Sequence, residues 1–336
     1  MRVTLADVAE LAGVTPQTVS HVLSGTRGVR ITQETRDRII AAANELGYKP
    51  NRLARAMKTG KTKIISAWIP INRPNLSSLK FIQELHEVIT KDQYDLIVSG
   101  VKSELAYAAH GDLPNIFPVD GIIAFDAQKA FKAFRGQKTN DQIPGLVLGY
   151  ELFNNADTLA WDLHGASVKV MRLMLKTGST RIVHLLPEWV ESGFPNERRR
   201  RAYTETMLGQ HLRPELVSAT GESVAEGYRA MATYLSEGHH RPDGVFAFND
   251  ALALGAVKAL ESIGLRVPTD CQVWGMGDFE EAREADKPVS TMRIPFREVA
   301  SCAWKLLKDR IDGKRNDSEL ITLPMEIIPR ATSRDT

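Results

Sequence analysis

The chain has 336 residues, more than one domain usually contains, so two or three domains are expected. Its 43% hydrophobic and 25% charged residues are ordinary for a globular protein and exclude the disordered, collagen-like and coiled-coil classes. No apolar run approaches the about 18 residues of a membrane span, and no apolar signal segment is visible at the start. Two cysteines are too few for a disulfide framework. We therefore expect a cytoplasmic protein with no membrane partner.

Positive charge is concentrated at the start of the chain. Residues 1–62 hold ten Lys and Arg residues against five acidic ones, whereas the rest of the chain has a net charge of −3. A small basic segment on a slightly acidic body predicts that only this segment meets a polyanion.

Two short helices are predicted at the beginning of this basic segment. The first ends at Gly13, and its inward face is Leu5, Val8, Ala9 and Ala12. The second is capped by Thr15 and begins at Pro16. Proline suits the first position of a helix, because no N–H is needed there. Its inward residues are Val19, Val22 and Leu23, which leaves four polar side chains facing solvent: Gln17, Thr18, Ser20 and His21.

A third amphipathic segment follows Ile31. We expect Thr32 to cap it and Gly47 to end it, with an inner face made of Ile39, Ile40, Ala43 and Leu46. Two helices joined by a glycine turn, with polar residues at the start of the second, are typical of a helix-turn-helix that enters a DNA major groove. A small three-helix bundle without a DNA role is the alternative interpretation.

From residue 64 onward, apolar runs alternate with helical periodicity. The strand-like runs lie at 63–69, 95–98, 121–125, 145–148, 181–186, 244–248 and 271–275. Helical segments are predicted at about 76–91, 165–177, 197–209, 224–237, 250–263 and 296–312. This alternation predicts parallel sheets with helices on both faces, in two similar subdomains with a cleft between them.

The basic segment resembles the N-terminal signature of the LacI/GalR family of bacterial transcription regulators. The matching runs are residues 5–23, 35–36, 46–51 and 53–57, and runs at 162–165, 178–182, 249–255, 264–268, 273–278 and 329–332 extend the likeness through the body. The resemblance implies an N-terminal all-α helix-turn-helix headpiece. An α/β periplasmic-binding-protein-like core of two Rossmann-like subdomains is implied to follow it. The implied function is a repressor that binds a palindromic DNA operator as a homodimer and responds to a small-molecule effector, expected to be a carbohydrate or an acidic sugar derivative.

Domain boundaries also follow from the resemblance. It implies a DNA-binding domain over 1–50, a hinge helix and linker over 51–61, and an effector-binding and dimerisation core over 62–336. Within the core, the N-subdomain is expected at about 62–161 and 293–322, and the C-subdomain at about 162–290 and 324–336. The chain is expected to cross between them near 161–163, 290–293 and 321–324.

The same resemblance implies which residues meet DNA. Pro16, Gln17 and His21 are the expected base readers, and Met57 is the expected hinge-helix wedge in the minor groove. The full implied DNA-contact set is Thr4, Thr15, Pro16, Gln17, Thr18, Ser20, His21, Thr32, Asn51, Ala54 and Met57.

An effector pocket is implied in the core. Its expected residues are Arg199, Asn249, Trp161, Ser223, Asp278 and Asn72, while Asp250 is expected to cap the following helix. Gly277 stands where the family usually has a sugar-binding Asp, and Ser223 and Leu163 also depart from its pattern. These departures favour an acidic sugar or another anion, able to pair with Arg199, over a neutral hexose.

No enzyme or metal signature is found in the sequence. Gly275-Met276-Gly277 lacks the third glycine of a dinucleotide loop, and His239 and His240 are adjacent rather than spaced for a metal. We expect no catalytic residues, no metal and no cofactor. One alternative keeps the DNA-binding role but gives it a nucleobase-like or other non-sugar effector, a protein effector or none. A remoter alternative is a sugar-binding protein or enzyme without a DNA role.

Overall fold

The structure is a computed structural model that describes residues 3–23, 30–48, 56, 60–71, 76–101, 118–136, 142–149 and 156–335. The chain divides into two compact units, Met1–Lys63 and Ile64–Thr336. Each unit has its own hydrophobic core and is described by itself. Among the described residues, none of the helices combines the length and the hydrophobicity that crossing a membrane requires.

The first unit is a bundle of three helices, α1 (Leu5–Ala12), α2 (Pro16–Leu23) and α3 (Gln33–Glu45). Most of its core consists of residues that the periodicity places inward, namely Val8, Ala9, Ala12, Val19, Val22, Ile39 and Ala43. Ala42 joins this core without having been predicted, and the predicted Leu5, Leu23 and Leu46 pack against it partly buried. The prediction for Ile40 is wrong, since its side chain is 46% exposed. The inner stripe of α3 passes through Ile39 and Ala43, and Ile40 lies on its flank, one residue further around the helix.

The second unit begins with a six-stranded, all-parallel sheet in the order β11-β5-β4-β3-β1-β2. Its strands are β1 (Ile64–Pro70), β2 (Asp95–Val101), β3 (Gly121–Phe125), β4 (Gly145–Leu148), β5 (Ala156–Trp161) and β11 (Leu320–Leu323). Helices α5 (Leu76–Thr90) and α13 (Phe296–Ile311) pack on one face, and α6 (Gln128–Arg135) packs on the other. Alternate residues of β1, β3 and β4 therefore belong to two different hydrophobic clusters.

A second six-stranded sheet has the order β12-β10-β9-β8-β6-β7, in which only β12 is antiparallel to its neighbour. Its strands are β6 (Ile182–Pro187), β7 (Glu215–Ala219), β8 (Gly244–Ala247), β9 (Gln272–Gly277), β10 (Ser290–Arg293) and β12 (Glu326–Ile328). Its helices are α7 (Leu163–Lys176), α9 (Arg198–Gly209), α10 (Val224–Ser236) and α11 (Asp250–Ser262), with the short α8 (Glu188–Gly193) and α12 (Glu280–Arg283). The two sheets with their covering helices confirm the predicted α/β class.

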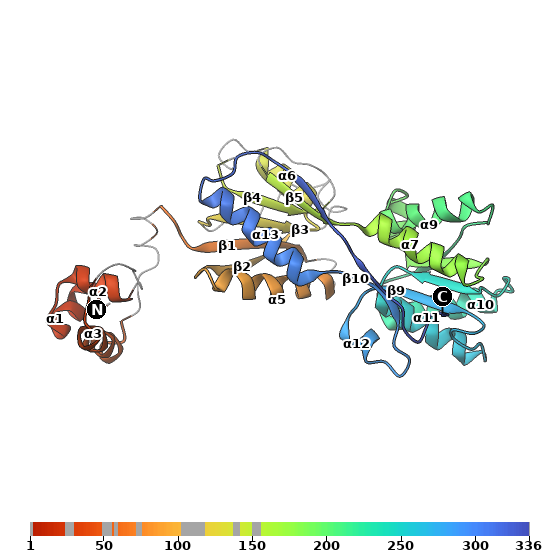
Figure 1. The fold of residues 1–336 in the computed structure, drawn as a ribbon, viewed down its shortest axis with the longest axis horizontal. Coiled ribbons are helices and arrows are strands. Elements are labelled where there is room, and N and C mark those ends of the chain that lie inside the picture. The colour runs from red at the N-terminus through yellow and green to blue at the C-terminus, as the bar shows by residue number, and fades with distance from the viewer. Residues whose placement is uncertain are drawn as a thin grey trace. The chain divides into compact units, whose positions relative to one another are not determined.

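The chain passes between the two sheets at three places (Figure 1). It leaves the first sheet after Trp161 and enters α7 at Leu163. It returns after β10 through Ile294 and Pro295 into α13, and passes once more between β11 and β12. The middle crossing was expected near 290–293. These residues form β10 of the second sheet, so the crossing begins directly after them, at Ile294.

Candidate functional site

The helix starts of the headpiece are fixed by threonine caps. Thr4 and Asp7 form a capping box on α1, with a 2.7 Å bond from the backbone N–H of Thr4 to the Asp7 carboxylate. Thr15 Oγ1 accepts from the N–H of Thr18, and Thr32 Oγ1 accepts from that of Thr35. Both predicted caps are confirmed. Three of the expected DNA contacts, Thr4, Thr15 and Thr32, therefore lie at helix N-termini, where free N–H groups favour phosphate.

The start of α2 carries polar side chains on its outer face. Pro16, Gln17 and Ser20 are exposed, whereas Thr18 and His21 are half-buried. Arg38 Nε donates a 2.9 Å hydrogen bond to the carbonyl of Ala12 and so ties α3 to the end of α1. The other expected DNA contacts, Asn51, Ala54 and Met57, and the expected effector residue Asn72, lie outside the described residues.

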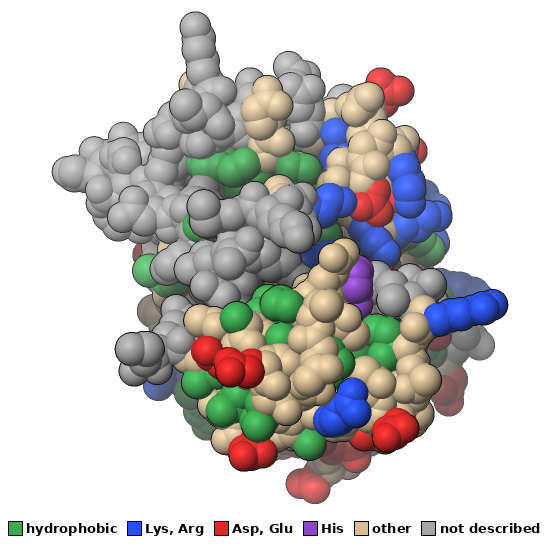
Figure 2. All heavy atoms as spheres, turned by 90° about the vertical axis from the view of Figure 1, so that its left-hand side faces the viewer, with side chains coloured by type: hydrophobic (Ala, Val, Ile, Leu, Met, Phe, Trp, Pro, Cys, Tyr) green, Lys and Arg blue, Asp and Glu red, His purple; other side chains and the backbone are tan. Residues whose placement is uncertain are grey.

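The positive charge of the headpiece is not carried by its three helices. Residues 3–23 and 30–48 contain three arginines against five acidic residues. Six of the ten basic residues of the segment lie in stretches outside the described residues: Arg2, Arg27, Lys49, Arg52, Arg55 and Lys58. On the face drawn in Figure 2, acidic and basic side chains are both visible, with hydrophobic side chains among them.

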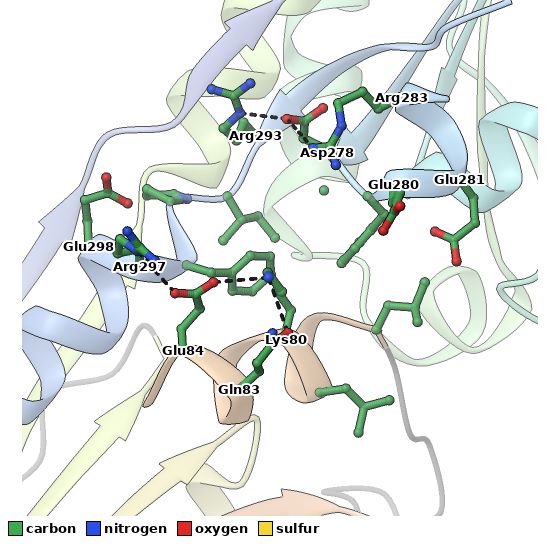
Figure 3. Close-up of a pocket in the computed structure, with 17 residues that line it drawn as sticks. Lys80, Gln83, Glu84, Asp278, Glu280, Glu281, Arg283, Arg293, Arg297 and Glu298 are labelled. Carbon is green, nitrogen blue, oxygen red and sulfur yellow. Dashed lines mark hydrogen bonds and ion pairs between the residues drawn. The ribbon is translucent and has the colours of Figure 1, made fainter. Parts of the chain in front are cut away.

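In the core, a cavity of about 490 Å³ lies between α5 and the segment that follows β9. The passage from β10 to α13 completes its lining. Figure 3 shows Lys80, Gln83 and Glu84 on one wall, with Asp278, Glu280 and Glu281 on the other. The cavity is thus next to the carboxyl end of β9, where ligands bind in open α/β sheets.

Most charges that line this cavity are already paired with other side chains of the protein. Glu84 is bound by Lys80 at 3.1 Å and by Arg297 at 3.4 Å. Asp278 is bound by Arg293 at 2.7 Å and also by Arg330, and only 3% of its side chain is exposed. Salt bridges hold the pKa of Asp278 below its ordinary value in spite of burial, which acts in the opposite direction. Arg283 Nη1 also lies 3.9 Å from this carboxylate, so Asp278 lines the cavity with a group already paired with three arginines.

Gly277 adopts a backbone conformation that is reserved for glycine, with φ of +132°. A Cβ atom at this position would lie 2.3 Å from the ring of Phe279. The departure from an aspartate at this position therefore has a structural basis, because the loop after β9 is closed over Gly277 by Phe279.

Arg199 lies at the start of α9, beside the carboxyl ends of β8 and β9. Its guanidinium covers the ring of Phe248, with Cζ 3.3 Å from the ring centroid. Nε donates to Glu197 at 2.9 Å, and Nη1 donates to the carbonyl of Phe248 at 2.7 Å and is 3.6 Å from Met276 Sδ. The residue is buried and does not line the cavity, although Met276 directly precedes the lining residue Gly277.

Asn249, and not Asp250, caps α11. Asn249 Oδ1 accepts from the N–H of Leu252 at 2.8 Å, so the prediction of an Asp250 cap is wrong by one residue. The Asp250 carboxylate is buried and instead accepts hydrogen bonds from Thr291 Oγ1 at 2.6 Å and from the N–H of Phe279 at 3.0 Å. Burial raises the pKa of Asp250 to about 6.

The remaining expected effector residues are spread over the core. Ser223 forms a capping box with Glu226 at the start of α10. Trp161 ends β5, is 9% exposed and lies 6.1 Å from the ring of Phe125. Of the expected residues that the structure describes, only Asp278 lines the cavity.

Sequence reasoning missed Glu197 and Phe248, which surround Arg199. Glu197 caps α9, since its Oε2 accepts from the N–H groups of Arg199 and Arg200. An acidic residue immediately before an arginine-rich helix start is a recognisable N-cap signal. Phe248 carried no such signal, because its contact with Arg199 joins residues 49 positions apart.

Two family models match the chain. Residues 4–51 match the model described as bacterial regulatory proteins, lacI family. Residues 171–333 match a periplasmic binding protein-like domain.

Curated relatives and solved structures align along nearly the whole chain. The HTH-type transcriptional repressor PurR of Vibrio vulnificus is 26% identical over 339 residues, covering 98% of both chains. PurR of Klebsiella pneumoniae is 28% identical over 337 residues, covering 99% of this chain and 97% of that protein. The lac repressor dimer bound to operator and the anti-inducer ONPF has a TM-score of 0.78 at 24% identity, with 99% of each chain covered. At 24% identity, the likeness to the lac repressor concerns the fold alone.

Proposed function

Because the chain belongs to the LacI/GalR family of bacterial transcription regulators, we propose that it represses transcription by binding a palindromic operator as a homodimer. A small molecule held between the two sheets of the core controls this binding. The observation that carries the proposal is the headpiece, a compact unit separate from the α/β core whose second helix begins with exposed polar side chains.

The base readers of this proposal are Pro16, Gln17 and His21. An exposed glutamine can pair with both hydrogen-bonding groups of adenine, while an imidazole can reach a guanine edge. The capping threonines, Ser20 and Asn51 supply phosphate contacts, and Met57 wedges into the minor groove. Thr18 and Ala54 complete the proposed set of DNA contacts. The support is the exposed face of α2 and the family membership.

Operator binding is tested by fluorescence anisotropy with the full-length protein and a duplex selected from a random library. Affinity for the selected duplex should fall by about three orders of magnitude between 50 and 200 mM salt, because several phosphate contacts release counterions. Gln17→Ala should lose about 1–3 kcal/mol of binding free energy, and the control Gln33→Ala, also an exposed glutamine in a first helical turn, should lose little. Equal affinity for the selected and random duplexes would contradict the proposal.

A homodimer is supported by exposed hydrophobic side chains around the edge strand β2. Ile71, Leu79 and Val98 are 59%, 55% and 46% exposed. Among the described strands, β2 is the last one in its sheet, and a sheet edge with exposed apolar side chains is a typical protein-protein surface. Val98→Asp should shift sedimentation toward the monomer, whereas Leu208→Asp, at another exposed leucine (58%), should leave the dimer intact.

Arg199, Trp161 and Asn249 are the proposed effector contacts, together with the cavity beside Gly277. The support is their place at the carboxyl ends of parallel strands, β5 for Trp161 and β8 for Asn249. Effector binding is tested by a thermal-shift screen of sugars and nucleobases on the wild type and on Arg199→Ala. A hit that raises the melting temperature of both proteins equally would remove Arg199 from the site.

A further inference from the structure

We propose that Glu197 is a specificity-determining residue of the effector site: its carboxylate occupies the anion position beside Arg199, so that the accepted effector is uncharged. The inference rests on the proposed function in one respect, the role of Arg199 as an effector contact. It reverses the sequence-based preference for an acidic sugar.

The Glu197 carboxylate lies at the N-terminus of α9. The N-terminus of a helix, with its free N–H groups and positive dipole, is a natural site for an anion, and arginines there strengthen it. At α9 the two N–H groups of Arg199 and Arg200 donate to Glu197 Oε2 at 2.9 and 3.0 Å, and Arg199 Nε donates to Oε1 at 2.9 Å. The protein's own carboxylate therefore takes the three donors that would hold an anionic ligand.

Most of the Arg199 guanidinium already contacts other groups of the protein. One face of the guanidinium is covered by the Phe248 ring, and Nη1 is used by the Phe248 carbonyl. A carboxylate or phosphate is gripped side-on by Nε and Nη2 together, and Nε is already used by Glu197. In the part of the chain that the structure describes, Nη2 makes no hydrogen bond, so it is the donor left for a ligand.

Arg199 and Glu197 neutralise each other's charge in a salt bridge. Side-chain exposure is 9% for Arg199 and 13% for Glu197, so their mutual attraction is only weakly screened by water. An anionic ligand would meet a neutralised arginine and the like charge of Glu197. The two N–H groups of Nη2 instead match neutral acceptors, such as a sugar hydroxyl, a carbonyl or a ring nitrogen. The two uncharged sources, sugars and nucleobases, share this acceptor chemistry.

The cavity charges agree with this selection. Asp278 and Glu84 already neutralise Arg293, Lys80 and Arg297 at the cavity. Glu280 and Glu281 add exposed negative charge to the opposite wall, as Figure 3 shows. An anion in the cavity would therefore meet no uncompensated positive charge among these lining residues.

The test uses inorganic phosphate as the probe and the full-length protein, at constant ionic strength set with potassium chloride. Glu197→Ser removes the carboxylate but keeps a strong helix cap, and Glu197→Gln is a second, isosteric variant. Each is compared with its double mutant carrying Arg199→Ala. Melting temperature and titration calorimetry report phosphate binding.

We expect Glu197→Ser to bind phosphate at least tenfold more tightly than the wild type and to lose this gain with Arg199→Ala. If the wild type already binds phosphate through Arg199 as tightly as the Glu197 variants, the proposal is overturned. It is equally overturned if neither variant gains affinity. A wild type that fails to bind any operator duplex would contradict the proposed function and leave this result unaffected, since phosphate binding is measured without DNA.

The two uncharged sources are separated with lactose and adenine as probes on the wild type. Binding of either, reduced at least tenfold by Arg199→Ala, agrees with the inference. Tighter binding of galacturonate than of galactose, or of adenosine monophosphate than of adenosine, would overturn it.

Discussion

The carboxylate of Asp250 accepts a 2.6 Å hydrogen bond from the hydroxyl of Thr291, which joins the first turn of α11 to β10 inside the core. Its second oxygen accepts from the N–H of Phe279, in the loop beside the cavity. The charged and titratable neighbour that acts on it is Asp278, whose negative charge adds to the effect of burial. Asp250 is therefore a buried carboxylate held by neutral donors.

This arrangement predicts a pH-dependent stability. Burial raises the pKa of Asp250 from its ordinary 3.8 to about 6, so between these values the folded state binds a proton that the unfolded state has released. The contribution of Asp250 to stability should therefore fall as pH rises from 4 to 6, by about 1.4 kcal/mol per pH unit at most. Asp250→Asn, which mimics the protonated group, should abolish this slope and be more stable than the wild type at pH 8. Urea unfolding of the core transition at several pH values measures it, and a variant with the wild-type pH profile would refute the role of Asp250.

His184 should act with the opposite sign. Its Nδ1 is 2.7 Å from the carbonyl of Phe246, and its buried Nε2 has no hydrogen-bond partner among the described residues. Burial lowers the pKa of His184 to about 4, so between pH 4 and 6.5 the unfolded state binds the extra proton and stability rises with pH.

His184→Gln should remove this rise, because a neutral amide keeps a donor for Phe246 but does not titrate. Since the slopes of Asp250 and His184 oppose each other between pH 4 and 6, the variant should show the falling stability that His184 offsets in the wild type. The same urea series, with the double variant as reference, checks it. Parallel profiles for the wild type and His184→Gln would contradict the assignment.

The long periodic segments were predictable from the sequence, whereas five strands lie outside the predicted strand-like runs, namely β5, β7, β10, β11 and β12. The predicted helices at 224–237 and 250–263 correspond to α10 and α11, because one apolar face at a 3.6-residue period decides both. Strand β5 was missed because it contains Asp157 and Thr158, which read as exposed residues although both are completely buried. Their burial depends on partners more than 150 positions away, which no local pattern reveals.

In the candidate site, too, local contacts could be predicted from the sequence and distant ones could not. Thr15 and Thr32 were predictable as caps because a cap bonds to a residue three positions away. Asp250 was misassigned because its partners, Thr291 and Phe279, come from other strands and loops. The contact of Phe248 with Arg199 is likewise a product of the tertiary fold and could not be predicted from spacing.

The buried Asp157 should be essential for the stability of the first sheet. It accepts from Arg310 Nε at 2.7 Å, Arg315 Nε at 3.2 Å and the N–H of Glu319 at 3.1 Å, and so anchors the segment that leads into β11. Asp157→Ala leaves Arg310, whose side chain is 8% exposed, without its carboxylate and should cost about 3–5 kcal/mol. The control Arg229→Ala, at a pair whose arginine is 68% exposed, should change little. Urea unfolding compares the two, and equal midpoints would show that the Asp157 cluster adds no stability.

Restoring an aspartate at Gly277 should impair the protein rather than give it a sugar site. The position has φ of +132°, which strains any residue with a Cβ, and the added atom would lie 2.3 Å from the Phe279 ring. Gly277→Asp should therefore lower stability by about 1–3 kcal/mol and displace the loop that Asp250 and Asp278 hold. A second variant, Gly277→Asp with Phe279→Ala, removes the ring but not the backbone strain, so it should recover only part of the loss. Melting temperatures of the three proteins and calorimetry with lactose measure both effects. A single variant that is as stable as the wild type and gains lactose affinity would show that this loop adapts to a carboxylate and that Phe279 does not close it.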